Sequence, residues 1–348
     1  MKLMTRSVMS RHIHLAATAL VGALLASCAS VEMPASAQIG ECASQARCSA
    51  KPGDLIEVSL RELHPTQPSL GYDEVYYKLG RYKLGKDAVN KRFDDWCEAN
   101  GQSGAESAQA GASLKNPDSF SCKIKVGAET EASIESMKTA VIGPRGTLFL
   151  TDGHHTFTSF MEHADGGPDL KVRVRVQGNL SKLSNADFWR EMEKNGWTWL
   201  RDVNDKPIMP EQLPQKLGLK NFQNDPYRGV LYFGRDIGYS QLKDNATFLE
   251  FYWGRWFRTH PSVKIEDYDL SNLDAYMALL RKLTEAQVAL DDGGIVSNGK
   301  TAGELGKLAA WNRGKAESSG EFGKMKKPYS DAKPGKIAYA LEYKKSLP

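Results

Sequence analysis

The sequence predicts an α+β fold, and three observations support this class. Residues 170–179, LKVRVRVQGN, alternate between valine and basic side chains, which is typical of a half-buried strand. Two short apolar runs on either side of Pro144-Arg145-Gly146 indicate a hairpin. In the second half of the chain, aromatic side chains recur at helical spacing. The 348 residues are enough to form a full hydrophobic core.

The N-terminus is typical of a secretory signal over residues 1–27, because a basic start precedes an apolar run that is too short to span a membrane. The sequence Leu25-Ala26-Ser27-Cys28 resembles a bacterial lipobox, which predicts lipid attachment to Cys28. Cleavage after Ala37 is the alternative. We therefore expect an exported lipoprotein on the periplasmic face of the outer membrane, with an Ala- and Ser-rich tether over residues 28–52.

The net charge argues against an extended nucleic-acid surface. Residues 1–27 carry three basic and no acidic residues, so their removal lowers the formal net charge from +4 to +1. Extended DNA binding needs a strongly basic face. We therefore expect no extended DNA binding.

The four cysteines after Cys28 predict two disulfides, because an even number in an exported chain is typical of cross-linking. Four cysteines allow three pairings. Proximity in the sequence favours Cys42–Cys48 and Cys97–Cys122. A zinc site made of all four thiolates is the rival, although the spacings contain no C-x2-C knuckle.

The elements of the first half follow in order. Residues 56–59 predict a strand, which a proline-broken loop follows. Apolar residues at helical spacing predict a helix that ends at Gly101, and the polar residues 102–119 predict an exposed insertion loop. After the hairpin, a helix is expected from His154 or His155 to the Gly-Gly pair at 166–167.

The second half is predicted to be mainly helical. We expect a helix capped by Asn185, an apolar helix over residues 247–260, and a helix with a Ser271-x-x-Asp274 capping box. From residue 299 the chain is polar and Gly- and Lys-rich, which is typical of a solvated tail. Residues 324–345 carry seven lysines and two acids, so contact with an anionic surface is the alternative.

The most informative stretch is FLTDGHHTFTSF, residues 149–160, in which two histidines follow Asp-Gly. Adjacent histidines on a helix point about 100° apart, and His163 lies about 12 Å along the axis from His155. This spacing does not support chelation of one ion, so we assign no metal site here. Asp152 with one histidine and distant ligands is the remaining metal hypothesis, and a divalent cofactor is left open.

The same stretch favours an anion site. A strand that enters a helix through Asp152-Gly153 leaves the first backbone N–H groups of the helix unpaired. Glycine lets an anion approach closely, and the helix dipole attracts it. His154, His155 and Thr156 would add side-chain donors. The alternative is that the histidines only cap a core helix.

Three motifs resemble the ParB/sulfiredoxin superfamily, and most of all the branch called putative ParB-like nuclease: LHPTQPSLGYDEVYYK (63–78), TDGHHTFTSF (151–160) and NDPYRGV (224–230). This resemblance covers about residues 53–260. It implies a mixed sheet with helices over 53–180, and we expect a helical extension over 181–298 packed on it. The composition, not the resemblance, predicts a polar basic tail over 299–348. The resemblance also places Gly153, His154, His155 and Thr156 at a phosphate-binding helix start.

The sequence differs from better-known relatives at this helix start. These differences argue against sulfiredoxin activity, nucleotide-triphosphate binding and kinase activity. Sulfiredoxins carry Gly-Cys-His-Arg at this helix start, whereas His154 and Thr156 replace the cysteine and the arginine here. Partition-type ParB proteins carry Gly-Glu-Arg-Arg, whose arginines hold nucleotide phosphates. Related free-serine kinases use a glutamate in the early loop, where this chain has Gln67, and an amide cannot act as a general base.

The resemblance and the residue chemistry together predict a pocket. His155, His154 and Glu74 are the candidate catalytic groups, because each could act as a base. The predicted anion-binding residues are Gly153, His154, His155, Thr156, Lys78 and Arg228, and Gln67, Asp152 and Tyr227 would complete the lining. For Lys78 and Arg228, solvated ion pairs are the alternative.

The predicted function is a site for a phosphate-containing ligand, with phosphodiester or phosphate-ester hydrolysis as its activity. The alternative is a non-catalytic envelope protein that binds an anionic metabolite or a protein partner through the same pocket.

Overall fold

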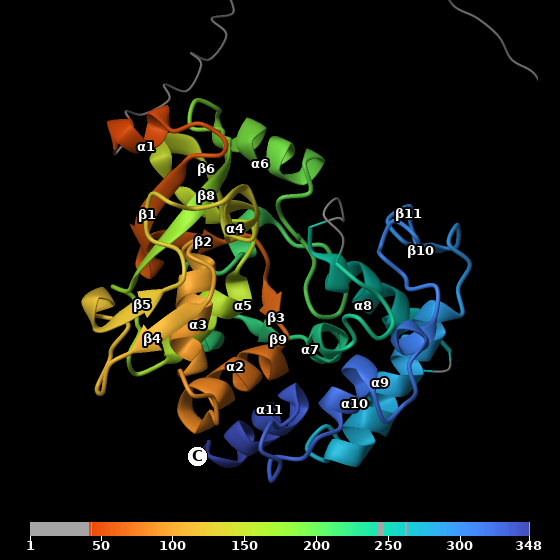
Figure 1. Ribbon diagram of the computed structural model, residues 1–348. Coiled ribbons are helices and arrows are strands. Elements are labelled where there is room, and N and C mark those ends of the chain that lie inside the picture. The colour runs from red at the N-terminus through yellow and green to blue at the C-terminus, as the bar shows by residue number, and fades with distance from the viewer. Residues whose placement is uncertain (1–41, 43, 242–246, 262, 348) are drawn as a thin grey trace, which may run out of the picture. The chain divides into compact units, whose positions relative to one another are not determined.

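The computed structural model describes residues 42, 44–241, 247–261 and 263–347 (Figure 1). Contacts divide the chain into two compact units, Met1–Gln38 and Ile39–Pro348, and every described residue belongs to the second. The predicted signal segment and Cys28 lie outside the described residues. Within the described part, no helix is both long and apolar enough to cross a membrane.

A mixed five-stranded sheet forms the centre of the first half, with the strand order β1-β8-β6-β7-β2. Its outer pairs are β1 with β8 (antiparallel) and β7 with β2 (parallel), while β6 lies parallel to β8 and antiparallel to β7. The bounds are β1 Leu55–Ser59, β2 Leu63–Pro65, β6 Thr139–Ile142, β7 Leu148–Leu150 and β8 Lys171–Asn179. The predicted α+β class with a mixed sheet is therefore confirmed.

The strand β8 shows why the alternating pattern was informative. Val172, Val174 and Val176 are buried, whereas the residues between them are partly exposed. The predicted hairpin is also confirmed, since β6 and β7 pair around a turn at Pro144–Gly146. Gly146 has a φ of 84° in this turn, a backbone conformation that glycine adopts without strain.

Helices α2 (Tyr72–Leu84), α3 (Lys91–Ala99) and α5 (His154–Glu162) share a hydrophobic core with the sheet (Figure 1). We did not expect α2, because two prolines and a glycine directly before it suggested a loop. Val75, Leu79 and Tyr82 lie at helical spacing and are buried, so packing against the core stabilises this helix.

The insertion at 102–119 differs from the expected loop, because it contributes most of a small hairpin of β4 (Ala105–Ala108) and β5 (Phe120–Cys122). The two disulfides are Cys42–Cys48 and Cys97–Cys122, which confirms the pairing that proximity favoured. Two disulfides indicate an oxidising environment, as expected for an exported protein.

Part of the predicted tether is folded. Helix α1 (Gln45–Ser49) lies within it, and Arg47 Nη2 contacts Glu62 Oε1 at 2.6 Å. The short elements of the remaining chain are α4 Glu131–Glu135, the parallel pair β3 Ser69–Leu70 and β9 Gln223–Asn224, and the antiparallel pair β10 Ile295–Ser297 and β11 Lys300–Thr301.

The second half packs around its own aromatic core, which includes Trp253 and Tyr276. Its helices are α7 Pro226–Phe233, α8 Leu249–Thr259 and α9 Leu273–Val288, whereas α6 Asn185–Lys194 packs on the sheet through Phe188 and Met192. Two predicted caps are wrong by one residue. Ser184 rather than Asn185 accepts the N–H of the first turn of α6, and Asn272 rather than Ser271 caps α9. The side-chain oxygen that reaches the N–H of the third helical residue sets the cap.

The last fifty residues differ from the expected solvated tail. They contain α10 (Gly320–Met325) and α11 (Lys336–Lys345), and α11 lies along α2 (Figure 1). The side chains of 337–341 are buried there. A Cβ on Gly80 would lie 2.5 Å from the Tyr339 carbonyl oxygen, so the two helices approach closely. Lysines interleaved with apolar residues made this segment look polar in the sequence.

Candidate functional site

The strand β7 enters α5 through Thr151, Asp152 and Gly153, as the motif predicted. Gly153 has a φ of 101°, and a Cβ there would lie 2.7 Å from Lys138 Cγ. Glycine is therefore required on two grounds, backbone conformation and space. No side chain in the described part of the chain caps α5, so its first N–H groups have no side-chain partner there.

A cavity of about 270 Å³ lies at this helix start. Residues from the sheet, α2, α5, α7 and α8 line it. The predicted residues among them are Gln67, Glu74, Asp152, Gly153, His154, His155, Thr156 and Arg228. Segments that are far apart in the sequence therefore meet here.

His154 is held as a neutral imidazole. Its Nε2 accepts the Thr66 N–H at 3.1 Å, which leaves the proton on Nδ1 in the tautomer that this contact implies. Burial, with a smaller contribution from Arg228, lowers the pKa of His154 to about 3 although Asp152 opposes the shift. This histidine ties the loop after β2 to the start of α5.

His155 has an analogous role one residue later. Its Nε2 accepts the Gly71 N–H at 3.1 Å, and its Nδ1 lies 3.5 Å from Arg228 Nη2. Burial and the adjacent Arg228 charge hold the pKa of His155 well below its usual value. Both histidines therefore bind the backbone that leads into α2, and the lone pair of each ring is already engaged.

A buried charge network forms one wall of the cavity. Arg228 Nη1 donates to Glu74 Oε2 at 2.9 Å, and Arg228 Nη2 lies 3.5 Å from Glu250 Oε2. Arg235 Nε donates to Glu250 Oε1 at 2.6 Å. Although burial opposes ionisation, the two arginines lower the pKa of Glu250 to about 2. Arg228 and Arg235 are therefore already neutralised by carboxylates.

Two predicted residues do not line the cavity. Lys78 Nζ donates to Asp95 Oδ2 of α3 at 3.1 Å. Although burial opposes the charge, Asp95 raises the pKa of Lys78. Tyr227 lies in a different cavity, with the Arg258 guanidinium 5.0 Å from its ring centre. The structure thus brings Arg228 to the helix start and directs these two side chains elsewhere.

The residue that sequence reasoning missed is Arg175 of β8. It pairs with Thr139 of β6 in the sheet and lines the cavity. Its Nε is buried and meets no hydrogen-bond partner among the described residues, and within that same part it forms no ion pair. The alternation of β8 places Arg175 on the face opposite the buried valines, but only the folded chain shows that it lines the cavity at the start of α5.

The basic side chains of the cavity differ in whether a carboxylate neutralises them. Lys138 Nζ contacts Asp152 Oδ2 at 3.2 Å, and Arg228 and Arg235 contact carboxylates. Arg175 alone among these four has no carboxylate partner in the described ranges. It is therefore the group best placed to neutralise an anionic ligand.

Comparison with known proteins shows which family the chain resembles. The family model described as "Putative ParB-like nuclease" matches residues 56–259, more than half of the chain. The chain belongs to this family. No curated protein matches it significantly. The crystal structure of protein Atu1540 from Agrobacterium tumefaciens is similar, with a TM-score of 0.45 and 18% identity, over 66% of this chain and 90% of that one.

In this ParB-like protein, the described residues contain one group of carboxylates close enough to share a metal ion, Asp94, Asp95 and Glu98 on α3. It lies outside the cavity, and Lys91 Nζ contacts Asp95 Oδ1 at 2.9 Å. Lys78 contacts the other oxygen of Asp95. These lysines supply the positive charge that an ion would bring, so the cluster is explained by ion pairing.

Proposed function

We propose that the cavity at the start of α5 binds a phosphate group of a small ligand. The observation that carries this proposal is Arg175, a guanidinium at the cavity whose Nε is buried and has no partner among the described residues. A buried donor without a partner is costly, and a guanidinium suits the paired oxygens of a phosphate. A bound phosphate would satisfy it.

The helix start supports the same ligand. Its first N–H groups have no side-chain cap among the described residues, and the positive end of the helix dipole favours an anion there. Because burial keeps both histidines neutral, they add no full charge to the cavity. The cavity volume of about 270 Å³ suits a phosphate group with a small substituent.

A second candidate function is hydrolysis of a phosphodiester or phosphate ester. Two observations favour it, the description of the family and the meeting of Glu74, His155 and Arg228, with 3.7 Å between Glu74 Oε2 and His155 Nε2. However, each histidine already uses its acceptor nitrogen for a backbone N–H, and Arg228 engages Glu74. A base would have to release such a contact first, so the resting geometry favours binding.

The location is part of the proposal. We infer an exported protein anchored by lipid on Cys28 at the outer membrane, because the lipobox-like sequence stands at the end of an apolar signal and the disulfides fit an oxidising compartment. Cell fractionation of the protein and its Cys28→Ser variant tests this. If the parent and the variant distribute in the same way between the membrane and soluble fractions, the lipid anchor is excluded.

The binding test uses residues 39–348, which contain every contact of the described fold. Titration with inorganic phosphate should raise the melting temperature, and Arg175→Gln should weaken binding about 10- to 100-fold, as expected for loss of a charged hydrogen bond. Arg190→Gln is the matched control, because Arg190 lies on the exposed surface of α6 with 73% of its side chain accessible. Equal responses of both variants would contradict the site.

The catalytic test uses bis(p-nitrophenyl) phosphate and p-nitrophenyl phosphate, with and without Mg²⁺ or Mn²⁺. Turnover that Glu74→Gln abolishes, while phosphate still binds to that variant, would establish hydrolysis. Phosphate binding without turnover would establish the non-catalytic alternative, an envelope protein that binds an anionic metabolite.

A further inference from the structure

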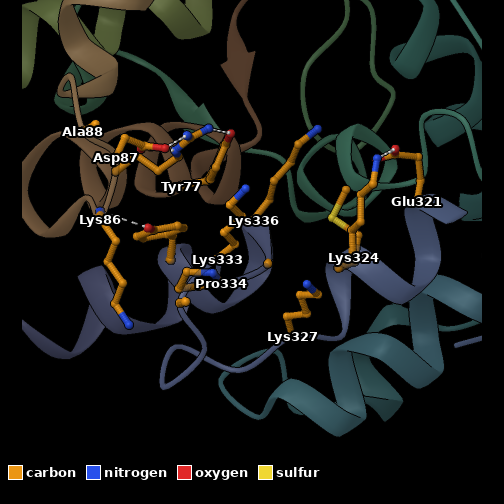
Figure 2. A pocket seen from close by; sticks show the side chains of 15 residues that line it. Tyr77, Lys86, Asp87, Ala88, Glu321, Lys324, Lys327, Lys333, Pro334 and Lys336 are labelled. Carbon is orange, nitrogen blue, oxygen red and sulfur yellow. Dashed lines mark hydrogen bonds and ion pairs between the residues drawn. The ribbon is translucent and has the colours of Figure 1, made fainter. Parts of the chain in front are cut away.

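A second cavity, of about 590 Å³, lies between α2, α10 and α11 and shares no lining residue with the first. Figure 2 shows that side chains from α2 and the loop after it face those of the C-terminal segment across this hollow. Its lining includes lysines of the C-terminal segment, which the sequence predicted to be a solvated tail. The fold therefore gathers these lysines around one space.

The lining is strongly basic and only partly neutralised. Two of its cations have carboxylate partners. Arg81 Nη2 donates to Asp87 Oδ1 at 2.6 Å, and Lys324 Nζ donates to Glu321 Oε1. The remaining cations have no carboxylate partner among the described residues. They are Lys86, Lys327, Lys333 and Lys336. An excess of four positive charges therefore surrounds the hollow.

Lys336 is the most informative of these lysines. Its side chain is half-buried, and burial lowers its pKa. Among the described residues its Nζ forms no ion pair and lies 5.3 Å from the centre of the Tyr232 ring, although the Glu321 carboxylate partly opposes the shift in pKa. Burying an ammonium group without a carboxylate is unfavourable. A bound anion would offset this cost.

The start of α11 adds to the positive field. Gly335 is the N-cap of this ten-residue helix, and none of the described side chains caps it. Pro334, Gly335 and Lys336 all line the cavity, so the positive end of the helix dipole lies at its wall. A Cβ on Gly335 would lie 2.3 Å from the Met325 carbonyl oxygen, which shows that α10 and α11 meet here without space to spare.

We propose that this second cavity binds clustered phosphate groups. Lys86 Nζ donates to the Tyr329 and Asp331 carbonyl oxygens, whereas the ammonium groups of Lys327, Lys333 and Lys336 have no hydrogen-bond or ion-pair partner among the described residues. These three lysines and a helix N-terminus exceed what a single phosphate needs, and the volume is about twice that of the first cavity. The same chemistry occurs in a soluble polyphosphate and in the headgroups of an anionic lipid surface. The site is independent of the phosphate site at α5, since the two share no residue.

The test uses residues 39–348 and two probes, inorganic tripolyphosphate and phosphatidylcholine vesicles with or without phosphatidylglycerol. Lys333→Gln with Lys336→Gln should weaken binding about 100-fold, at about tenfold for each charged hydrogen bond lost. Lys182→Gln with Lys206→Gln is the control, because both lysines are exposed elsewhere and the change in charge is the same. Melting temperature and circular dichroism verify that the variants are folded.

The outcomes are distinct. Binding of tripolyphosphate that the first pair of substitutions removes and the control retains supports a site for a soluble ligand. The same pattern with phosphatidylglycerol vesicles alone supports a lipid headgroup. Binding of neither probe, or equal weakening by both double variants, overturns the proposal. Arg175→Gln should leave binding at the second cavity intact. A failure of this proposal can therefore be distinguished from a failure of the site at α5.

Discussion

The two buried histidines should make the protein lose stability between about pH 7.5 and about pH 5.5. Their pKa values in the folded protein lie far below the ordinary value of 6.5, to about 3 for His154. Each ring is therefore neutral in the folded state throughout this range, whereas it takes up a proton in the unfolded chain. Protonation favours the unfolded chain, so this contribution is complete above pH 6.5 and decreases as the pH falls.

For His154 the magnitude depends on the unfolded pKa alone, because its folded pKa of about 3 lies below the range. With an unfolded pKa of 6.5 it loses about 1.4 kcal/mol of unfolding free energy over these two pH units, and His155 adds a loss of the same sign. The Glu250 carboxylate does not contribute here. The pKa of Glu250 is lowered to about 2, so its contribution is lost only below 4.5.

Urea unfolding of residues 39–348 at the two pH values measures this loss. The double variant His154→Gln with His155→Gln keeps an amide oxygen that can accept each backbone N–H but does not titrate. It should lose less than the parent between the two pH values, by about 1.4 kcal/mol for His154 and by a further amount for His155. Burial also lowers the pKa values of His64, His163 and His260, so the variant keeps a smaller slope. An unchanged slope in the double variant would refute the reasoning.

Three other perturbations test the packing and the charge network by thermal or urea unfolding. Gly80→Leu should separate α11 from α2, because its Cβ would lie 2.5 Å from the Tyr339 carbonyl oxygen, and should cost about 1–3 kcal/mol; an unchanged melting temperature would contradict the close approach. Cys97→Ser with Cys122→Ser opens a disulfide between residues 25 positions apart and should cost about 3 kcal/mol; an unchanged free energy of unfolding would contradict this role. Glu250→Gln leaves two buried arginines short of one negative charge and should cost about 3–5 kcal/mol, whereas a loss below about 1 kcal/mol would show that the network is solvated.

The local elements were largely predictable because their patterns depend on residues close in the sequence. The alternation in β8, the turn at Pro144–Gly146 and the glycine before α5 each specify backbone geometry directly. The disulfide pairing followed from proximity alone. In contrast, α2 escaped prediction, since its stability comes from packing on the core and its flanking prolines suggested a loop.

The candidate site was predictable in position and not in composition. The motif at 151–156 locates the uncapped helix start, but no local pattern reveals that the lone pairs of His154 and His155 are engaged by the N–H groups of Thr66 and Gly71. Those bonds join residues more than 80 positions apart, so they exist only once the sheet has formed.

By itself, the sequence determined the family, the mixed α+β class and the place where an anion would meet a helix, because these depend on short motifs and periodicity. Only the tertiary structure decided that Arg175 reaches the cavity while Lys78 pairs with Asp95, and that the lysine-rich C-terminus folds against α2. The reason is physical. Periodicity states which face of an element a side chain occupies, and packing decides what that face meets.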